Sequence, residues 1–406
     1  MVYLDKTKLL IDSGSANLAV ASTSLDGVST WFNASKSSTL NIDDDRIALK
    51  YQQGSWSGLI ANDFFDLVDT RSLPASKKPP RLYGQIALID EAKDFFLGTT
   101  DSMSWNGIMG LAFANIAVQP KNLAGISYVW IHYLFSQNIA IPPPTTSTPY
   151  LMPSTHSILD DVLKQYELND QFSVLLCGTS KLVTSNTFSA SMKQDGVLTI
   201  GGIKKSFKAD SKPFFYTPIR YAWYYEVILT DFRVNGKKVI EDCKELNFDK
   251  TILDTGTTNI RLPFRVFRKF VRLVRAHVRR SGKRGRAIGR DFWRSKSLLC
   301  QDPTSPLGGP LGSPYDMFPQ LTFDFVLAGN ASLMKSISTT LSPEQYIRYI
   351  GRVKSKGVDK DCFVFGVQPS TLGTILGSVF IEGFYTLFDR QNMKVSRPLL
   401  LLASSD

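Results

Sequence analysis

Two short stretches of the chain share one arrangement of an aspartate, small hydroxyl residues and a glycine. The first is LLIDSGSANLAV at residues 9–20, and the second is TILDTGTTNIRL at residues 251–262. In each stretch, apolar residues lead directly into an Asp, which is Asp12 or Asp254. A carboxylate is costly to bury without partners, so an Asp that ends an apolar run needs a specific role.

Two carboxylates in contact would supply acid–base chemistry. They cannot both ionise cheaply at contact distance, so one pKa rises and the pair holds a single proton. The ionised member can take a proton from water while the protonated member polarises a peptide carbonyl. Gly14 and Gly256 would let the two turns approach closely. The hydroxyl residues that could hydrogen-bond the buried carboxylates are Ser13, Ser15, Thr255 and Thr257.

Each Asp motif is followed downstream by a second shared feature. After the first comes WNGIMGLAFANIA at residues 105–117, and after the second comes GTILGSVFIEGF at residues 373–384. Both place a glycine directly after an apolar pair. The chain therefore holds two diverged copies of one unit, and two such lobes could bring one Asp each to a shared seam.

The elements that must position these motifs are predicted to be mainly strands. Aromatic residues make up 12% of the chain and β-branched residues are frequent, a composition that favours strands. Asn235-Gly236 is a strong hairpin signal. Helices are predicted at residues 157–168, after a Ser cap, and at residues 264–280, where apolar residues recur at helical spacing opposite a basic face. Further strands are predicted within residues 46–60, 81–89, 195–203, 224–239, 320–329 and 383–392.

In order and spacing, these motifs resemble those of the pepsin-type aspartic proteases, and within that family they are most similar to β-secretase. The stretches that carry the resemblance are KYQQGSWSG, WNGIMGLAFANIA, LTIGGI, YTPIRYAWYYEV, DCKELNFDKTILDTGTTNIRLP and IEGFYTLFDR. Many pepsin-like enzymes carry a cysteine pair shortly after the first Asp motif. The stretch SGSANLAVASTSLD of this chain has no cysteine, and in this respect it is similar to β-secretase. The resemblance covers most of the chain apart from residues 124–156 and both termini.

The resemblance implies a mainly β, bilobal pepsin-like acid protease fold, with two pseudo-symmetric β lobes and few short helices. Residues 1–212 would form the N-terminal lobe, with the first catalytic Asp and the flap, and residues 213–406 the C-terminal lobe, with the second. Residues 124–156 contain PPPTTSTP and an unpatterned apolar patch, which fit neither helix nor sheet. They are interpreted as an atypical surface insertion, with a binding loop as the alternative.

By the same resemblance, Asp12 and Asp254 are the catalytic pair, with no metal or cofactor. Ser13 and Thr255 would cross-brace the two loops. The residues supporting the catalytic loops would be Ser13, Gly14, Ser15, Thr255, Gly256 and Thr257, of which Ser15 and Thr257 would bond the outer carboxylate oxygens. The substrate-binding residues would be Tyr51, Gln53, Gly54 and Trp56 of the flap, together with Tyr224, Thr258, Asn259 and Arg261. Loop scaffolding remains an alternative role for Thr258, Asn259 and Arg261.

The implied activity is that of an aspartic endopeptidase of β-secretase type, which cuts extended peptides or ectodomains of membrane proteins at acidic pH. The resemblance also implies a monomer in the secretory or endosomal pathway and a membrane anchor in a full-length precursor. No signal peptide or transmembrane segment is expected within this chain itself. Catalysis by a Ser–His or Cys–His pair is disfavoured, because His277 is the one histidine outside residues 124–156.

The alternative function is that of a catalytically inactive or truncated pepsin-like homologue that only binds peptides. Three departures from the family pattern support it. The chain begins eleven residues before Asp12, without the family's first strand; VSRPLLLLASSD replaces the expected closing strand; and residues 124–156 interrupt the pattern. Sheet edges left unpaired in this way would be liabilities for folding.

The net charge of +11 is concentrated in one segment. Residues 261–296 hold fourteen Lys or Arg against one Asp, so the remaining chain is slightly acidic. The basic run at residues 264–296 is interpreted as a solvated helix face and loop, with an acidic partner or a membrane surface as the alternative. Nucleic-acid binding is disfavoured, because no recognised binding module surrounds the run.

Four cysteines without CxxC spacing disfavour a zinc site. The resemblance implies a disulfide between Cys300 and Cys362, whereas the state of Cys177 and Cys243 stays open. Asn33 and Asn330 each begin an N-glycosylation sequon, which together with the cysteines hints at a secretory route.

Overall fold

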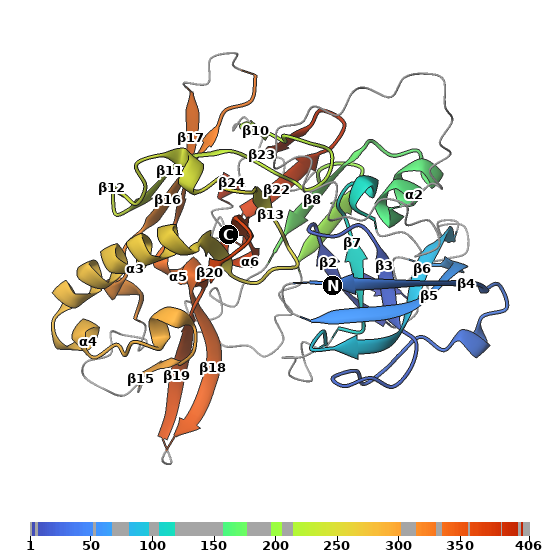
Figure 1. Cartoon of the computed structure of the whole chain (residues 1–406), viewed down its shortest axis with the longest axis horizontal. Helices are drawn as coiled ribbons and strands as arrows, with labels where there is room; N and C mark the ends of the chain where they lie inside the picture. Colours follow the sequence, from blue (N-terminus) through green and yellow to red (C-terminus); the bar gives the residue numbers. More distant parts are fainter. Residues whose placement is uncertain are drawn as a thin grey trace, which may run out of the picture. The chain divides into compact units, whose positions relative to one another are not determined.

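The computed structural model describes residues 2–4, 7–51, 54–66, 81–96, 105–117, 157–176, 196–204, 214–301, 314–329, 335–355, 358–382, 384–396 and 399–400. Strands dominate and the helices are few and mostly short, which confirms the mainly β class (Figure 1). The chain forms two compact units, Met1–Glu167 and Leu168–Asp406. The lobe boundary expected at residue 212 stays a prediction, and the insertion expected at residues 124–156 lies outside the described residues.

The first unit is built on one seven-stranded sheet in the order β1-β2-β7-β3-β6-β5-β4. Its strands are β1 (Val2–Leu4), β2 (Thr7–Asp12), β3 (Leu18–Ala21), β4 (Asn41–Lys50), β5 (Ser55–Phe65), β6 (Leu82–Lys93) and β7 (Gly107–Gly110). The short 3₁₀ helices are η1 (Ala34–Lys36) and η3 (Ala114–Ile116). The central strands β3 and β7 are buried along their whole length, as strands covered on both faces must be.

Helix α2 (Ile158–Gln165) packs on this sheet at the position predicted from its sequence. Ser157 precedes it, and Asp160 and Asp161 lie in its first turn, where the positive end of the helix dipole favours carboxylates. Its last residue, Gln165, accepts a hydrogen bond from the amide of Tyr83 at the start of β6 (3.1 Å). The helix is therefore tied to the strand that neighbours β3.

The described residues of the second unit form four sheets. The largest runs β10-β23-β22-β8-β9, with β24 also on β22, and its strands are β8 (Gln171–Leu175), β9 (Val197–Ile200), β10 (Tyr216–Pro218), β22 (Phe384–Asp389), β23 (Lys394–Ser396) and β24 (Leu399–Leu400). The second runs β12-β11-β16-β17, from β11 (Leu229–Val234), β12 (Lys237–Lys238), β16 (Leu321–Val326) and β17 (Ser336–Leu341). The third is β13-β21-β14-β20, from β13 (Thr251–Leu253), β14 (Ile260–Pro263), β20 (Val367–Ser370) and β21 (Thr374–Leu376). The fourth is β15-β19-β18, from β15 (Leu299–Gln301), β18 (Ile347–Ser355) and β19 (Val358–Phe365).

Among the described residues of the second unit, the α-helices are α3 (Phe264–Val278), α4 (Lys283–Arg286), α5 (Pro343–Tyr346) and α6 (Ser378–Ile381), and the short 3₁₀ helices are η7 (Cys243–Glu245), η8 (Arg279–Ser281), η9 (Phe292–Arg294) and η10 (Tyr315–Met317). Helix α3 confirms the second predicted helix. Its buried face meets an aromatic core in which Phe270 lies 5.5 Å from Phe232 on β11 and 6.0 Å from Phe365 on β19, between ring centroids. Such burial stabilises a helix more than its own propensity does.

Both units contain the same four-strand arrangement, as the repeated motifs predicted. In the first, β2 is parallel to β7, β7 is antiparallel to β3, and β3 is parallel to β6. In the second, β13, β21, β14 and β20 repeat that order with the same sequence of parallel and antiparallel pairs. In each copy the strand that leads to the Asp therefore pairs with the strand of the apolar-apolar-Gly motif.

The expectation that the closing strand is missing was wrong. Strand β23 pairs with β22, where Phe388 faces Val395, and with β10, where Tyr216 faces Ser396. Val395 and Ser396 are buried, so the residues VS that begin the divergent C-terminal sequence still fill a sheet position. At the other end, β1 pairs with β2 in an antiparallel hairpin.

Cys300 on β15 and Cys362 on β19 form a disulfide, as the resemblance implied. Cys243 is an exposed free thiol, and Cys177 lies outside the described residues. Asn33 is exposed and its side-chain oxygen caps η1, whereas Asn330 lies outside the described residues, so glycosylation stays a prediction. Among the described helices, none has the length and apolar character needed to cross a membrane.

One half-buried carboxyl, that of Glu382, is expected to make the stability of the second unit depend on pH. Burial raises the pKa of Glu382, after α6, to about 7, although the nearby guanidinium of Arg348 acts in the opposite direction. The backbone carbonyl of Glu382 accepts a hydrogen bond from Gln345 on α5 (2.8 Å). Because the folded-state pKa lies above the ordinary value of 4.5, ionising this carboxyl costs more in the folded chain than in the unfolded chain.

We expect the stability contributed by protonated Glu382 to be complete below about pH 4.5 and lost as the pH rises through about 7. In Glu382→Gln, urea-induced unfolding should lose part of this pH dependence, at most about 3 kcal/mol over that range. The matched control is Glu241→Gln, because Glu241 is exposed on a loop of the same unit. An unchanged pH dependence in Glu382→Gln would contradict the assignment.

Candidate active site

Asp12 ends strand β2 and is almost completely buried, with 4% of its surface exposed. One carboxylate oxygen, Oδ1, accepts a hydrogen bond from the amide of Gly14 (2.8 Å), and the other, Oδ2, accepts one from the hydroxyl of Ser15 (2.5 Å). The backbone carbonyl of Asp12 accepts from the amide of Leu111, directly after β7 (2.7 Å). Both oxygens of a buried carboxylate are thus satisfied by its own loop.

Asp254 has the same surroundings at the end of β13, and 8% of it is exposed. Its Oδ1 accepts hydrogen bonds from the amides of Gly256 (2.9 Å) and Thr257 (3.2 Å). Its Oδ2 accepts a hydrogen bond from the Thr257 hydroxyl (2.7 Å). The sequence predicted the hydroxyl donors Ser15 and Thr257, and within each loop the structure places them on the expected carboxylate.

A glycine of the neighbouring strand allows each loop to lie this close. A Cβ on Gly110 would lie 2.5 Å from the carbonyl oxygen of Ser15, and one on Gly377 would lie 2.3 Å from that of Thr257. Contacts this short to backbone atoms exclude any side chain. The second glycine motif of each repeat is therefore explained by close backbone approach at the Asp loop.

Ser13 and Thr255, the two residues expected to brace the loops, are buried within their own units. The carbonyl of Thr255 accepts a hydrogen bond from the hydroxyl of Ser378 at the start of α6 (3.0 Å). The amide of Ser378 also donates to the carbonyl of Thr257 (2.7 Å). The first residue of α6 is therefore hydrogen-bonded to the Asp254 loop at two carbonyls. No motif in the sequence indicated this contact. Cross-bracing between the loops stays a prediction.

The residues expected to form a flap lie on or beside the hairpin that joins β4 to β5. The amide of Tyr51 donates to the carbonyl of Gly54 (3.0 Å), and the indole of Trp56 donates to the Tyr51 hydroxyl (3.4 Å). The Tyr51 ring stacks on Phe95 with centroids 5.4 Å apart, so its side chain is anchored at both ring and hydroxyl. Gly54 has φ +83°, a conformation suited to glycine. Gln53 lies outside the described residues.

Three of the expected substrate-binding residues follow the Asp254 loop in sequence. Arg261 on β14 lies near Asp254; burial lowers the pKa of its guanidinium, and the negative charge of Asp254 acts in the opposite direction. Asn259 is half-buried, and its side-chain oxygen has no hydrogen-bond partner among the described residues. Thr258 is exposed, and its backbone carbonyl accepts a hydrogen bond from the backbone amide of Val379 on α6 (2.9 Å). Their contact with a substrate stays a prediction.

Tyr224 lies near charged residues of the second unit. The resemblance predicted Tyr224 as a substrate-binding residue, but the sequence did not identify these charged neighbours. The ammonium of Lys250 lies 5.1 Å from the centre of the Tyr224 ring, at cation–π distance. Nearby Glu226 pairs with Ile252 of β13 through a backbone bridge and with Arg220 through a 2.6 Å salt bridge. Burial raises the pKa of Glu226, while Arg220 acts in the opposite direction. Glu226 carried no motif signal, since only the pairing to β13 brings it there.

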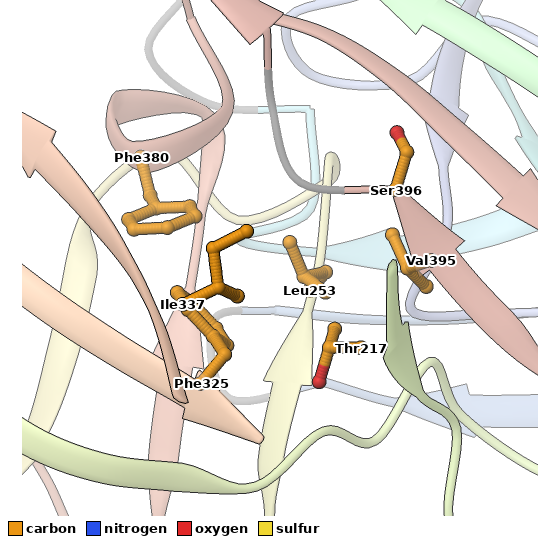
Figure 2. Close-up of a pocket in the computed structure, with 7 residues that line it drawn as sticks. All are labelled: Thr217, Leu253, Phe325, Ile337, Phe380, Val395 and Ser396. Carbon is orange, nitrogen blue, oxygen red and sulfur yellow. The ribbon is translucent and has the colours of Figure 1, made fainter. Parts of the chain in front are cut away.

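A small apolar cavity lies beside Leu253, the residue that precedes Asp254 (Figure 2). Its volume is about 10 Å³, room for one water at most. The lining residues are Thr217, Leu253, Phe325, Ile337, Phe380, Val395 and Ser396. This space is therefore part of the packing beneath the Asp254 loop and too small for a substrate.

Comparisons with known proteins support the same interpretation. A model of the eukaryotic aspartyl protease family matches residues 5–140 and 165–398, and these blocks include both Asp loops. The chain is 34% identical to a beta-secretase of Strongylocentrotus purpuratus over 96% of this chain and 63% of that protein. It is 22% identical to pepsin II-1 and 23% identical to gastricsin of Oryctolagus cuniculus, over 95% of this chain and 76% of each relative. The resemblance inferred from the motifs is confirmed, and the chain spans 63% of the length of the matched beta-secretase.

The close approach at Gly377 gives a test of the loop geometry. Gly377→Ala should destabilise the second unit by about 1–3 kcal/mol, because the added methyl group would displace the Thr257 carbonyl. The measurement is the midpoint of urea-induced unfolding. Gly289→Ala is the matched control, since a Cβ there meets nothing within 4 Å. Equal stability of the two variants would contradict the described packing.

Proposed function

Because the chain belongs to the eukaryotic aspartyl protease family, we propose that it is an aspartic endopeptidase whose Asp12 and Asp254 act together on one water molecule. One observation carries the proposal: the same four-strand unit occurs twice, and each copy ends in a buried Asp held by its own loop. A single such loop has no partner carboxylate. Two copies supply the pair that this chemistry needs.

In the proposed reaction, the two carboxyls share one proton. The ionised member takes a proton from water, the water oxygen bonds to the peptide carbonyl carbon, and the protonated member gives its proton to the carbonyl oxygen. The tetrahedral intermediate then loses the amine: the carboxyl that gained the proton of water gives it to the amine nitrogen as the C–N bond breaks, and the other, now ionised, carboxyl takes a proton from an intermediate hydroxyl, which restores the shared proton. The donors from Gly14, Ser15, Gly256 and Thr257 would hold each carboxylate in place throughout.

The flap hairpin would close over the substrate. Tyr51 is fixed by Trp56 and Phe95, so its position is set before a peptide binds. A pre-positioned group that excludes water from the reacting carbonyl is a recognised way to complete an active site. Gln53 and Gly54 would contact the backbone of an extended peptide, and Tyr224, Thr258, Asn259 and Arg261 would line the rest of its path.

The substrate class follows from the likeness to β-secretase. We infer that the enzyme cuts ectodomains of membrane proteins at acidic pH in the secretory or endosomal pathway. It would act as a monomer, and a full-length precursor would carry a membrane anchor. The disulfide between Cys300 and Cys362 supports an oxidising compartment, since such bonds are rare in the cytosol.

The first test is hydrolysis of a peptide pool from about pH 3.5 to 7, where paired carboxyls give a bell-shaped profile. Asp12→Asn and Asp254→Asn should each lower the rate by at least about 10²-fold, because each removes one half of the proton relay. Asp26→Asn, at an exposed position of the first unit, is the matched control and should keep full activity.

Two outcomes would overturn the proposal. Activity that survives in either Asp variant would exclude the paired-carboxyl mechanism. Peptide binding without turnover at any pH would instead establish the alternative, a catalytically inactive homologue that only binds peptides. Binding of an extended peptide to the unchanged chain therefore has to be measured alongside hydrolysis.

A further inference from the structure

Helix α3 of the second unit has two faces with different tasks. Its apolar face is buried and carries Val266, Phe267, Phe270, Val274 and Val278. Its other face carries a row of arginines, Arg268, Arg272, Arg275 and Arg279, spaced four, three and four residues apart. Residues with this spacing lie one above another on a helix, and the row spans about 16 Å.

This arginine row forms one wall of a groove. Arg290 and Arg294, at the start and end of the turn that contains η9, line the groove with it. Phe267 and Trp293 also line it, and they are only 7% and 4% exposed, so they form an apolar base. The groove has a volume of about 510 Å³, and none of the described residues that line it is acidic. We call it the arginine groove; α3, α4 and β15 mark its part of the chain in Figure 1.

The guanidinium groups of the arginine groove are available for a ligand. None of its six arginines forms an ion pair with a carboxylate in the described part of the chain. Two basic residues just outside the groove are paired with carboxylates, Lys269 with Glu245 (2.9 Å) and Arg284 with Asp316 (3.2 Å). Five of the six arginines are exposed and Arg275 is half-buried. Six guanidinium groups without a carboxylate partner among the described residues therefore line a single groove.

We propose that the arginine groove binds a linear sulfated polysaccharide. Guanidinium groups bind tetrahedral oxyanions through paired N–H donors, and a row of them suits a chain with repeated anionic groups. Phe264, which also lines the groove and is 57% exposed, offers an aromatic ring to the apolar face of a sugar, while Phe267 and Trp293 close the base beneath.

Other polyanions fit the observations less well. Insertion of α3 into a membrane would require an exposed apolar face, but that face is buried in the aromatic core, so only the weaker attraction of its charges to anionic lipids would remain. A nucleic acid would have to share a compartment with a protein that contains the Cys300–Cys362 disulfide, and such bonds persist outside the reducing cytosol and nucleus. Sulfated polysaccharides are the abundant linear polyanions that remain, and this argument does not depend on the proposed protease activity.

The test is binding of heparin, as the sulfated probe, to the whole chain by calorimetry over a salt series. The triple variant Arg268→Gln/Arg272→Gln/Arg275→Gln should weaken binding at least about tenfold. The slope of log affinity against log salt concentration should become shallower by about two to three, because each lost contact with an anionic group releases about one counterion fewer. The matched control, Arg280→Gln/Lys283→Gln/Arg286→Gln, removes the same charge outside the groove and should weaken binding less than about threefold. Thermal melting of both variants establishes that they remain folded.

Four outcomes would overturn the proposal. The first is an equal loss of heparin affinity in the two glutamine triple variants, and the second is no heparin binding at physiological salt. The third is an unchanged affinity for desulfated heparin. The fourth is tighter binding of a single-stranded oligonucleotide or of phosphatidylserine vesicles than of heparin. The first would show that net charge alone is responsible. Arg268→Lys/Arg272→Lys/Arg275→Lys keeps the charge and should give an intermediate affinity, because lysine lacks the paired donors of arginine.

Discussion

The burial of two carboxylates is the constraint on which the rest of this structure depends. An aspartate placed in the interior needs hydrogen-bond donors at both oxygens, and in this chain each Asp loop supplies them from its own backbone and hydroxyl groups. Those donors reach the carboxylate only if the loop turns tightly at Gly14 or Gly256. A tight loop in turn needs a glycine at the facing position of the neighbouring segment, where a Cβ would meet the loop backbone. Gly110 and Gly377 occupy these positions.

The four-strand unit satisfies that constraint in the same way twice. The strand that leads to each Asp lies parallel to the strand that carries the close-packed glycine, and two further strands continue the sheet. Parallel strands covered on both faces are apolar along their length, which is why an apolar run precedes each Asp. The surrounding elements differ between the units, because α2 supports the first sheet and α6 holds the second Asp loop.

The second unit carries features that the Asp loops do not require. An aromatic core of Phe232, Phe270 and Phe365 buries one face of α3, and this burial leaves the opposite face free to collect arginines. The same helix therefore contributes to stability on one side and presents concentrated positive charge on the other. Glu382 is a second departure, because a carboxyl whose pKa burial raises to about 7 makes the stability of this unit depend on pH between about 4.5 and 7.

The sequence by itself determined the two Asp motifs, the hydroxyl donors Ser15 and Thr257, the hairpin between β4 and β5, and helices α2 and α3, because each depends on residues close together in the chain. It did not reveal that Gly110 and Gly377 lie against backbone carbonyls, nor that Ser378 holds the Asp254 loop, since those contacts join segments up to 123 residues apart. It also misjudged the closing strand: VS has little strand signal alone, but pairing with β10 and β22 makes it β23. Only the tertiary structure joined the arginine row of α3 to Arg290 and Arg294, because a groove needs two walls and local periodicity describes one.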